Sequence, residues 1–456
     1  MSLKYEKKDA LEKVKSKKEM ENYISKYINF LNIAKTEYRA AAFAEKTLKD
    51  AGFVNIETKK KLKAGDKVYF VNNEKSIYAA VIGKDDILSG MNIVGAHIDS
   101  PRLDLKPMPL YEKCHAGLLK TQYYGGIKKY QWTAIPLSMY GVIYNEKGEK
   151  IEIALGEGED SPCFTITDLL PHLAREQMKK GANEFIDPEK LVVLFGSNKL
   201  DEKDESIKEK VKENILKILN KKYGIKEIDF ARSEISLVPA FKAREVGIDE
   251  SLVGGYGQDD KSCAFASLEA ILNVSNPNKT AVVMLVDKEE IGSIGNTSMS
   301  SNIFDMFVKK IIRLKGEDTD ILEAYYNSKM LSADVSTLVD PSYDEVSDVQ
   351  NGNIIGCGIA LEKYTGSGGK YNASDANAKF VSEIMNLFEK NMVAFQMGTL
   401  GKIEKGGGGT IAYILAEKGV NVIDCGPGVL SMHSPFEIAS KVDLYMAFKA
   451  YEAFMK

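Results

Sequence analysis

Hydrophobic positions along the chain predict strands that alternate with helices. Short apolar runs indicate strands, and several are apolar throughout, as expected of strands covered on both faces. These runs are Tyr78–Ile82, Ile93–Ala96, Leu191–Phe195, Ala281–Val286, Ile354–Ala360 and Val420–Ile423. Helical spacing of apolar residues occurs in Met20–Leu31, Tyr38–Leu48, Cys263–Leu272, Ile303–Leu314, Ala376–Glu389 and Lys441–Lys456. The alternation predicts a layered α/β domain.

The stretch from about Leu103 to Ala243 has a different pattern. It contains turn signals such as Tyr124-Gly125-Gly126 and strand-like runs such as Ile151–Leu155. One highly charged helical segment runs from Asp201 to Lys222. We interpret that segment as a solvated face or an insertion rather than as a binding element.

Composition narrows the function classes. The 456 residues predict two or three domains, and 61 Lys and Arg against 65 Asp and Glu give a net charge of -4. This balance argues against nucleic acid as a partner, because such binding needs a dense basic face. No run of about 18 apolar residues is present, so we expect no membrane span. The first residues lack an apolar signal core, and the five cysteines show no CxxC spacing, so we expect a reducing, cytoplasmic location.

The first segment with chemical potential is Gly95-Ala96-His97-Ile98-Asp99, directly after the mostly apolar run Met91–Val94. Residues two apart on a strand point to the same face, so His97 and Asp99 are expected side by side. A carboxylate there can accept a hydrogen bond from one imidazole nitrogen and leave the other to bind a metal. Taken alone, the pair also fits a buried histidine with a carboxylate partner.

Four more segments carry acidic groups or a histidine, most of them beside the end of a predicted element. Asp259-Asp260 precedes a helix, where a carboxylate bridges two cations or simply caps the helix. In Glu289-Glu290, one glutamate can bind metal while the other acts as general base, or the pair forms a charged turn. Asp334 and His433, each considered alone, also fit ordinary structural roles.

One ligand from each of the five segments gives two imidazoles and three carboxylates, a set that suits zinc, cobalt or manganese. They supply enough ligands for two sites that share one bridging carboxylate. If the strands lie as predicted, these residues are beyond the strand ends, where open α/β sheets bind ligands. Bound cations would also allow the acidic segments to converge without repulsion.

The order of the motifs resembles the aspartyl aminopeptidase family, metallopeptidase family eighteen of the co-catalytic zinc exopeptidase clan, in its bacterial type. The matching segments are Gly95–Arg102, Asp259-Asp260, Glu289–Ser293, Ser332–Asp334 and Ser431–Ser434, and the resemblance covers nearly the whole chain. It implies an α/β fold with a zinc-exopeptidase-like three-layer catalytic domain. It also implies a metalloaminopeptidase that hydrolyses the N-terminal residue, with acidic residues among the candidates, from peptides.

The resemblance implies two divalent metal ions per subunit, with Zn²⁺ expected first and Co²⁺ or Mn²⁺ as alternatives. One metal would be held by His97, Asp259 and Asp334. The other would be held by Asp259, Glu290 and His433, so that Asp259 bridges the pair. A cis peptide bond is expected between Asp259 and Asp260.

The remaining catalytic roles are also carried over from the family. Asp99 would orient His97, and Glu289 would act as general base and then as proton shuttle to the leaving amine. The histidine that matches His172 reaches across a dimer interface into the neighbouring active site. Lys363 is the candidate for a substrate-contacting lysine, with a solvated lysine as the equal alternative.

The family further implies a β-rich dimerisation domain inserted into the catalytic domain. The 162-residue gap from His97 to Asp259 (259 minus 97) is long enough to hold one. We expect the catalytic domain at 1–102 and 246–456 and the inserted domain at 103–245. The subunits are expected to form dimers that assemble into a tetrahedral dodecamer.

Two departures from the family pattern bear on specificity. Many members have a histidine shortly after the metal aspartate, where this chain has Ser336 and Thr337. The segment Lys363–Ala373 matches only loosely the region of the substrate-contacting lysine. A preference for acidic N-terminal residues is therefore open.

Three rival functions remain from the sequence. The nearest is another hydrolase of the same clan, such as a dipeptidase, carboxypeptidase or deacylase. A second is a catalytically silent assembly or cargo protein that retains the shell. A third, a nucleotide-binding enzyme that uses Gly406–Gly409, lacks the lysine of a phosphate loop.

Overall fold

The computed structural model describes residues 3–158, 161–201, 207–405 and 407–456, and these residues form two compact units. The first unit comprises Met1–Ser100, Ala243–Met432 and Phe436–Lys456. The second comprises Pro101–Lys242 and His433–Pro435. The chain leaves the first unit at 100/101 and returns at 242/243, whereas the sequence placed these boundaries at 102/103 and 245/246. A dimerisation role for the second unit stays a prediction.

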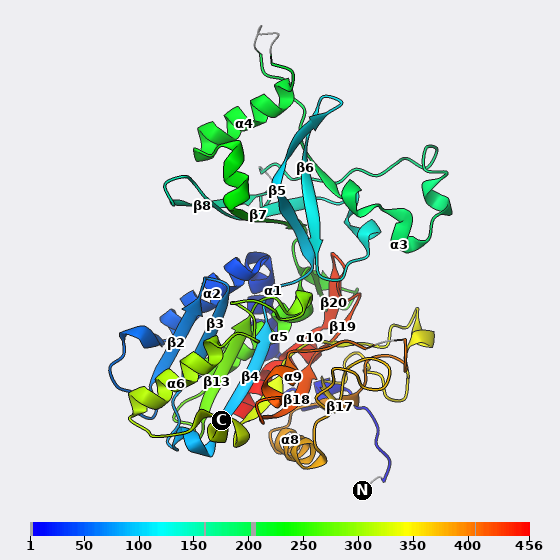
Figure 1. Cartoon of the computed structure of the whole chain (residues 1–456). Helices are drawn as coiled ribbons and strands as arrows, with labels where there is room; N and C mark the ends of the chain where they lie inside the picture. Colours follow the sequence, from blue (N-terminus) through cyan, green and yellow to red (C-terminus); the bar gives the residue numbers. More distant parts are fainter. Residues whose placement is uncertain (1–2, 159–160, 202–206, 406) are drawn as a thin grey trace. The chain divides into compact units, whose positions relative to one another are not determined.

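A nine-stranded mixed sheet forms the centre of the first unit (Figure 1). Across the sheet the strands are β1 (Val54–Asn55), β2 (Lys67–Asn72), β3 (Ser76–Val81), β13 (Thr280–Val286), β4 (Met91–His97), β14 (Lys329–Ser332), β18 (Asn421–Gly426), β16 (Ile359–Glu362) and β17 (Phe395–Gly398). The four central strands β13, β4, β14 and β18 run parallel to their neighbours in this group. Alternate side chains on β4 enter different hydrophobic cores, Val94 on one face and Ile93 on the other.

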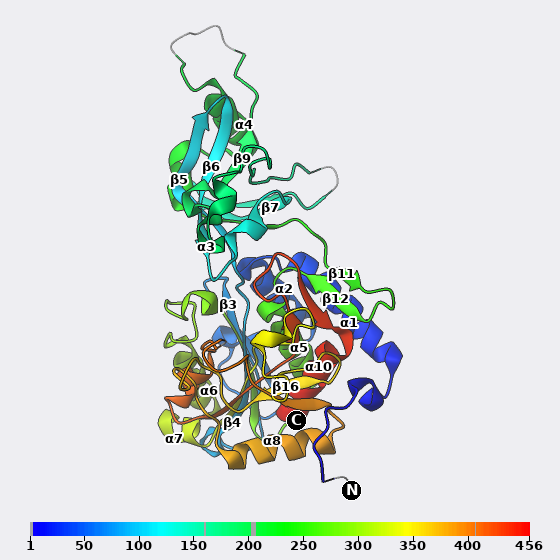
Figure 2. The same cartoon turned by 90° about the vertical axis from the view of Figure 1, so that its right-hand side faces the viewer.

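Helices cover both faces of this sheet and complete three layers (Figures 1 and 2). One core contains residues of α1 (Lys17–Ile33), α2 (Glu37–Asp50), α5 (Gln258–Leu272), α8 (Ala378–Lys390) and α10 (Lys441–Met455). The other contains residues of α6 (Ile303–Lys315), α7 (Ile321–Tyr326) and α9 (Ala412–Ala416). The predicted α/β fold with a three-layer catalytic domain is confirmed.

Local sequence explains where these helices begin. Ser16 and Thr36 accept hydrogen bonds from the backbone N–H groups of Glu19 and Arg39, and so cap the N-termini of α1 and α2. On α1, Met20, Ile24, Tyr27 and Leu31 recur every three or four residues and are buried. The apolar stripe seen in the sequence is therefore the face that packs against the core.

A smaller sheet in the first unit lies beside the start of α5. Its strands are β11 (Arg244–Val246), β12 (Leu252–Gly255), β20 (Glu437–Ser440), β19 (Gly428–Leu430) and β15 (Ser336–Thr337). In the antiparallel pairing of β12 with β20, Gly255 lies opposite Glu437. This register brings Glu437 close to the loop that leads into α5.

The second unit is built on a six-stranded antiparallel sheet. Its strands are β8 (Lys150–Leu155), β7 (Leu137–Tyr144), β10 (Ser233–Pro239), β5 (Arg102–Lys113), β6 (Ala116–Tyr124) and β9 (Val192–Gly196). Helix α4 (Lys210–Tyr223) buries Val211, Ile215 and Leu219 and contacts β5 and β6. A short helix, α3 (Ala182–Phe185), lies on the same unit.

Two predicted elements have different bounds in the structure. The strand expected at Ile354–Ala360 begins only at Ile359, because Gly356 and Gly358 adopt left-handed conformations (φ 77° and 92°) that turn the chain. The charged helix expected from Asp201 begins at Lys210, and residues 202–206 lie outside the described residues.

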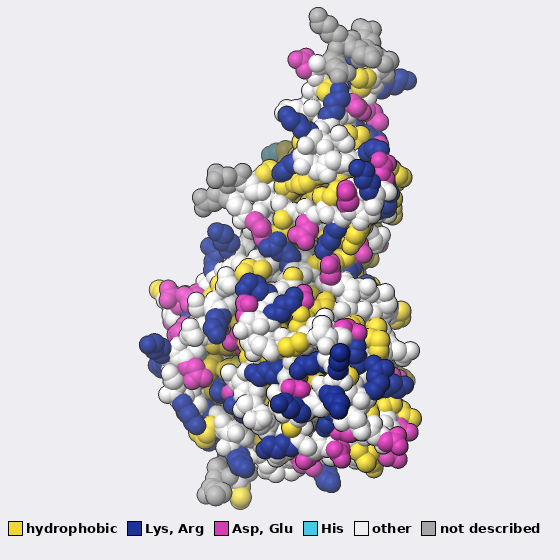
Figure 3. Space-filling model, turned by 90° about the vertical axis from the view of Figure 1, so that its left-hand side faces the viewer, with side chains coloured by type: hydrophobic (Ala, Val, Ile, Leu, Met, Phe, Trp, Pro, Cys, Tyr) yellow, Lys and Arg dark blue, Asp and Glu magenta, His cyan; other side chains and the backbone are white. Residues whose placement is uncertain are grey.

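The described surface carries charges of both signs, in keeping with the nearly equal numbers of basic and acidic residues. On the face of the first unit that Figure 3 shows, lysine and arginine side chains are spread among aspartate and glutamate. Within the described ranges, no helix has both the length and the apolarity needed to cross a membrane.

Candidate metal centre

Three neighbouring parallel strands bring the predicted residues to one edge of the large sheet. In the register of β13 with β4, Val286 lies opposite His97, and in that of β14 with β4, Ser332 lies opposite Gly95. The carboxyl ends of these strands therefore meet. His97 ends β4, the 3₁₀ turn Glu289–Ile291 follows β13, and Asp334 follows β14 two residues after Ser332.

The start of α5 supplies further carboxylates to the same edge. Gly257 adopts φ 75°, and the backbone at Asp259 and Asp260 is not helical, although both residues are assigned to α5. The Asp259–Asp260 peptide bond is cis, which confirms the expectation from the resemblance. Asp260 is fully buried, and its Oδ2 accepts a hydrogen bond from the backbone N–H of His97 at 3.2 Å.

Three carboxylate oxygens surround the Nε2 atom of His97. Asp259 Oδ1 lies 3.1 Å from it, Asp334 Oδ1 lies 3.7 Å from it, and Glu289 Oε2 lies 3.9 Å from it. The imidazole is only 1% exposed. One buried nitrogen is thus the common neighbour of acidic groups from three different chain segments.

Asp99 fixes the other side of the imidazole. Its Oδ1 lies 3.3 Å from His97 Nδ1, and its carbonyl oxygen lies 3.2 Å from the same nitrogen. Both are acceptors, so Nδ1 carries a hydrogen, and in the neutral ring Nε2 has the lone pair. A lone pair that faces carboxylate oxygens needs a cation, either a proton or a metal ion.

The same carboxylate also orders the turn that carries Glu289 and Glu290. Asp99 Oδ1 accepts a hydrogen bond from the backbone N–H of Glu289 and Asp99 Oδ2 accepts one from that of Glu290, both at 3.2 Å. Asp99 therefore ties the imidazole of His97 to the turn that carries the two glutamates, with one buried group placing both.

The crowding of acidic groups shifts their pKa values. Burial raises the pKa of Glu289 to about 8, opposed by His97 and reinforced by Asp334, Asp259 and Asp99. Burial likewise raises the pKa of Asp334, with His97 opposing. For His97, burial acts to lower the pKa, but hydrogen bonding to Asp259, Asp334 and Asp99 outweighs it and holds the pKa well above 6.5. A divalent cation at this position would relieve the same repulsion.

The donor set fits a metal ion. Ligand atoms of His97, Asp259 and Glu290 lie within 4.8 Å of one another, and so do those of His97, Asp260 and Asp334. Asp260 was not among the ligands expected from the sequence, and its Oδ2 is already bound to a backbone N–H. A carboxylate has a second oxygen, so Asp260 is a candidate ligand beside Asp259, whose Oδ1 lies 3.1 Å from His97 Nε2.

His433 is grouped with the second unit. Its Nδ1 lies 2.9 Å from the carbonyl oxygen of Gly126. A carbonyl only accepts, so this contact places the hydrogen on Nδ1 and the lone pair of the neutral ring on Nε2. The tautomer suits a metal ligand, and the assignment of His433 to the second metal stays a prediction.

The two residues predicted to contact substrate lie in exposed positions. His172 is in an exposed turn of the second unit. The Lys363 side chain is 44% exposed, and its Nζ lies 3.9 Å from Asp375 Oδ1. Both roles stay predictions.

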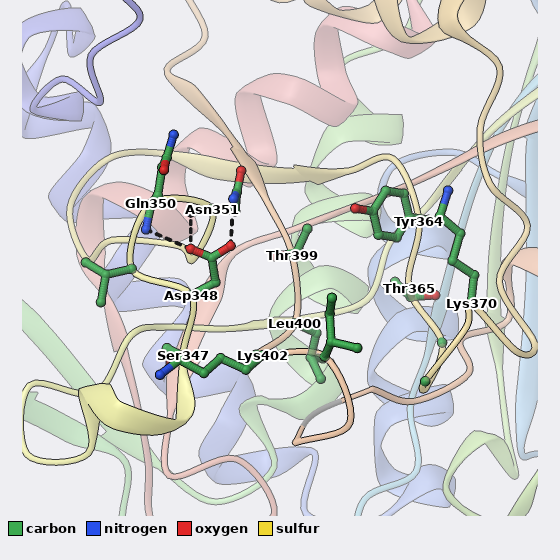
Figure 4. A pocket seen from close by; sticks show the side chains of 15 residues that line it. Ser347, Asp348, Gln350, Asn351, Tyr364, Thr365, Lys370, Thr399, Leu400 and Lys402 are labelled. Carbon is green, nitrogen blue, oxygen red and sulfur yellow. Dashed lines mark hydrogen bonds between the residues drawn. The ribbon is translucent and has the colours of Figure 1, made fainter.

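A cavity of about 770 Å³ is lined in part by Tyr364 and Thr365, which directly follow Lys363 in the chain. Figure 4 shows Tyr364, Thr365 and Lys370 on one side of it and Asp348 with Asn351 on the other. The ammonium of Lys370 lies 4.0 Å from the centre of the Tyr364 ring. Lys370, rather than Lys363, is the lysine of this segment that lines the cavity.

The sequence reasoning gave no role to three buried residues around Asp259. Ser100 and Lys261 hydrogen-bond to each other beside it, and Glu437 Oε2 accepts a hydrogen bond from its backbone N–H at 3.1 Å. The burial of Lys261 and Glu437 is not visible in the sequence, so no local signal marked these two charged residues. Ser100 lies inside the segment Gly95–Arg102, Lys261 directly follows Asp259-Asp260, and Glu437 lies three residues after Ser434.

Comparison with known proteins decides the family. The family model described as "Aminopeptidase I zinc metalloprotease (M18)" matches residues 30–455. The chain belongs to the M18 family. It is accordingly a metalloaminopeptidase, a peptide hydrolase.

Relatives match this M18 aminopeptidase in sequence and in fold over nearly the whole chain. The "Probable M18 family aminopeptidase 1" of Borrelia garinii is 48% identical, with 96% of this chain and 97% of the relative covered. The crystal structure of an M18 aminopeptidase from Thermotoga maritima is 44% identical with a TM-score of 0.96, covering 99% of this chain and all of that one. A dodecamer structure of S. cerevisiae mApe1, 22% identical with a TM-score of 0.76, shares the fold over 96% of this chain and 97% of that one. None of the rival functions is favoured by these matches.

Proposed function

We propose that this aminopeptidase uses a two-metal centre in which His97, Asp259 and Asp334 hold one ion and Asp259, Glu290 and His433 hold the other. The supporting observation is the cluster of Asp259, Asp334 and Glu289 oxygens within 4 Å of His97 Nε2. Zinc is the expected metal, since the matching family model describes a zinc metalloprotease, and Co²⁺ or Mn²⁺ are alternatives.

The metal ions, when bound, polarise the scissile carbonyl and acidify the attacking water. Glu289 then takes the proton of that water and passes it to the leaving amine. Its side chain is 18% exposed, which leaves it accessible to substrate. Asp99 holds both His97 and the Glu289 backbone, so base and ligand keep a fixed separation.

We further propose that the enzyme works as a homo-oligomer, with a dimer as building block and a tetrahedral dodecamer as the assembly. A dodecameric structure with the same fold supports this assembly. In the proposed assembly, His172 of one subunit would reach the active site of its neighbour and stabilise the developing oxyanion. The five free cysteines support a reducing, cytoplasmic location.

A panel of peptides with defined N-terminal residues, assayed with Zn²⁺, Co²⁺ or Mn²⁺, tests the function. We expect turnover only of peptides with a free α-amino group, and none of the same peptides after N-acetylation. Equal cleavage of blocked peptides would point to another hydrolase of the clan. Full activity in metal-free protein would contradict the metal mechanism.

A further inference from the structure

Lys261 is a buried lysine on the first turn of α5, two residues after the proposed bridging ligand Asp259. It is 1% exposed, and its Nζ donates a hydrogen bond to Ser100 Oγ at 2.5 Å. The ammonium also lies 5.6 Å from the centre of the Tyr256 ring. Burying an ammonium costs free energy, which its interactions inside the protein must offset.

The partner of Lys261 passes the interaction on to Asp259. Ser100 is 2% exposed, and its Oγ donates a hydrogen bond to the backbone carbonyl of Asp259 at 2.6 Å. An ammonium can only donate and a carbonyl can only accept, so the direction of the chain is fixed from Lys261 through Ser100 to Asp259. The charge at one end polarises the hydroxyl and strengthens its bond to the carbonyl.

The other side of Asp259 is held as well. The backbone N–H of Asp259 donates to Glu437 Oε2 at 3.1 Å, and Gln258 Nε2 donates to the carbonyl oxygen of Glu437 at 2.6 Å. Both backbone polar groups of Asp259 are therefore bound by residues from other segments. These bonds restrain the backbone of Asp259, whose carboxylate lies 3.1 Å from His97 Nε2.

Gly257 makes room for this arrangement. A Cβ at this position would lie 2.8 Å from Lys261 Nζ and 2.9 Å from Ser100 Oγ. A glycine is also suited to its φ of 75°. The absence of a side chain at Gly257 thus leaves room for the side chains of Lys261 and Ser100.

We propose that Lys261 and Ser100 are positioning residues that set the bridging carboxylate of Asp259 for metal binding. This inference rests on the proposed metal centre. The pair acts through the backbone carbonyl of Asp259. Residues that orient metal ligands in this way commonly contribute 10- to 100-fold to metal affinity.

The test measures metal affinity in variants of the full chain. Ser100→Ala removes both hydrogen bonds, Ser100→Thr keeps the hydroxyl, and Lys261→Met keeps the length of the side chain without its charge. Ser267→Ala is the matched control. Ser267 is buried, as Ser100 is, but it lies on α5 and donates a hydrogen bond to the Cys263 carbonyl at 2.7 Å. Zn²⁺ dissociation constants come from chelator competition, and the visible spectrum of the Co²⁺ form reports ligand geometry.

We expect Ser100→Ala and Lys261→Met to weaken Zn²⁺ binding by roughly 10- to 100-fold and to change the Co²⁺ spectrum. Ser100→Thr should restore most of the affinity, and Ser267→Ala should bind as the unmodified protein does. Circular dichroism of the metal-free proteins checks folding. If Lys261→Met does not fold, Ser100→Ala decides alone.

Unchanged affinity and an unchanged Co²⁺ spectrum in Ser100→Ala would overturn the positioning role. So would equal losses in Ser100→Ala and Ser267→Ala. His97→Ala separates this failure from that of the proposed function. If His97→Ala loses metal while Ser100→Ala keeps it, the metal centre stands and only the positioning role is wrong. If His97→Ala binds metal normally, the metal centre itself is wrong.

Discussion

His97 Nε2 and Asp259 Oδ1 lie 3.1 Å apart. Asp99 contacts the other ring nitrogen of His97, and both backbone polar groups of Asp259 are hydrogen-bonded. The two side chains come from segments 162 residues apart in the chain (259 minus 97). Neither atom can donate to the other unless His97 is protonated, so the pair is arranged for a shared cation.

Replacing the proposed general base should separate metal binding from turnover. Glu289→Gln keeps the size of the side chain but cannot accept the proton of the attacking water. We expect kcat to fall by roughly 10²- to 10⁴-fold while the metal content stays that of the unmodified enzyme. Elemental analysis beside steady-state kinetics measures both. Retained turnover would assign the base to another residue.

Removing the metal should lower stability as well as abolish activity. Chelation leaves the carboxylates of Asp259, Asp334 and Glu289 around one imidazole with only protons to offset their charge. Returning Zn²⁺ at about 1,000 times its dissociation constant should stabilise the fold by about 4 kcal/mol. Thermal melts with and without chelator measure this shift.

The control for that experiment is His97→Ala, which removes a ligand of one of the two proposed ions, so Zn²⁺ should produce a smaller shift of the melting midpoint than in the unmodified protein. A Zn²⁺ shift of equal size in His97→Ala would place the stabilising metal elsewhere in the chain.

Gly257→Ala should lower the affinity for Zn²⁺ in addition to lowering the stability of the fold. The added methyl would lie against Lys261 Nζ and Ser100 Oγ, both side-chain atoms that can move away. Gly316→Ala is the matched control, because Gly316 has φ 76° and a Cβ there meets nothing within 4 Å. Both variants should lose about 1–2 kcal/mol of stability from left-handed backbone strain. Only Gly257→Ala should also lose Zn²⁺ affinity, and equal affinities in the two variants would contradict this.

Asp443 should make stability depend on pH. It is fully buried at the start of α10 and accepts hydrogen bonds from the backbone N–H groups of Gly356 and Gly358 at 2.8 and 2.6 Å. Burial raises its pKa to about 7, against the lowering effect of these bonds. The folded chain therefore binds this proton more tightly than the unfolded chain. Its contribution to stability is present below about pH 4 and is lost as pH rises towards 7, by about 1.4 kcal/mol per unit of pKa shift.

Melting midpoints of the unmodified protein and Asp443→Asn between pH 5 and 8 test this. The midpoint of the unmodified protein relative to the variant should fall as pH rises and level off above about 7. Asp320→Asn, at the exposed N-cap of α7, should follow the unmodified protein across the range. A difference that is constant, or that grows with pH, would show that Asp443 is not the titrating group.

Lys363→Met tests whether the enzyme recognises acidic N-terminal residues. If Lys363 binds the substrate carboxylate, the loss of this charged hydrogen bond should raise KM for Asp and Glu peptides by roughly 10- to 100-fold and leave Leu and Met peptides unaffected. Lys370→Met is the comparison, since Lys370 lines the neighbouring cavity. A selective effect in Lys370→Met alone would transfer the role to Lys370, and no effect in either would remove it from this segment.

The sequence by itself determined the layered α/β fold and most of its elements. Buried parallel strands are apolar on both faces, and amphipathic helices repeat every three or four residues, so β4, β13 and α1 are visible as patterns. The ligand set stays a prediction from the sequence, because each segment alone also fits a structural role and only the five together, with the family resemblance, indicate a two-metal site. The strand at Ile354–Ala360 was misplaced because left-handed glycines and the distant Asp443 interrupt an apolar run.

Only the tertiary structure decided which atoms meet. The register of β13, β4 and β14 sets which strand ends are level, and no local pattern contains it. The contacts of Asp259 with Ser100, Lys261's partner, and with Glu437 join residues more than 150 positions apart. Such hydrogen bonds leave no periodic trace in the sequence, because each depends on how separate elements pack and not on the residues beside it in the chain.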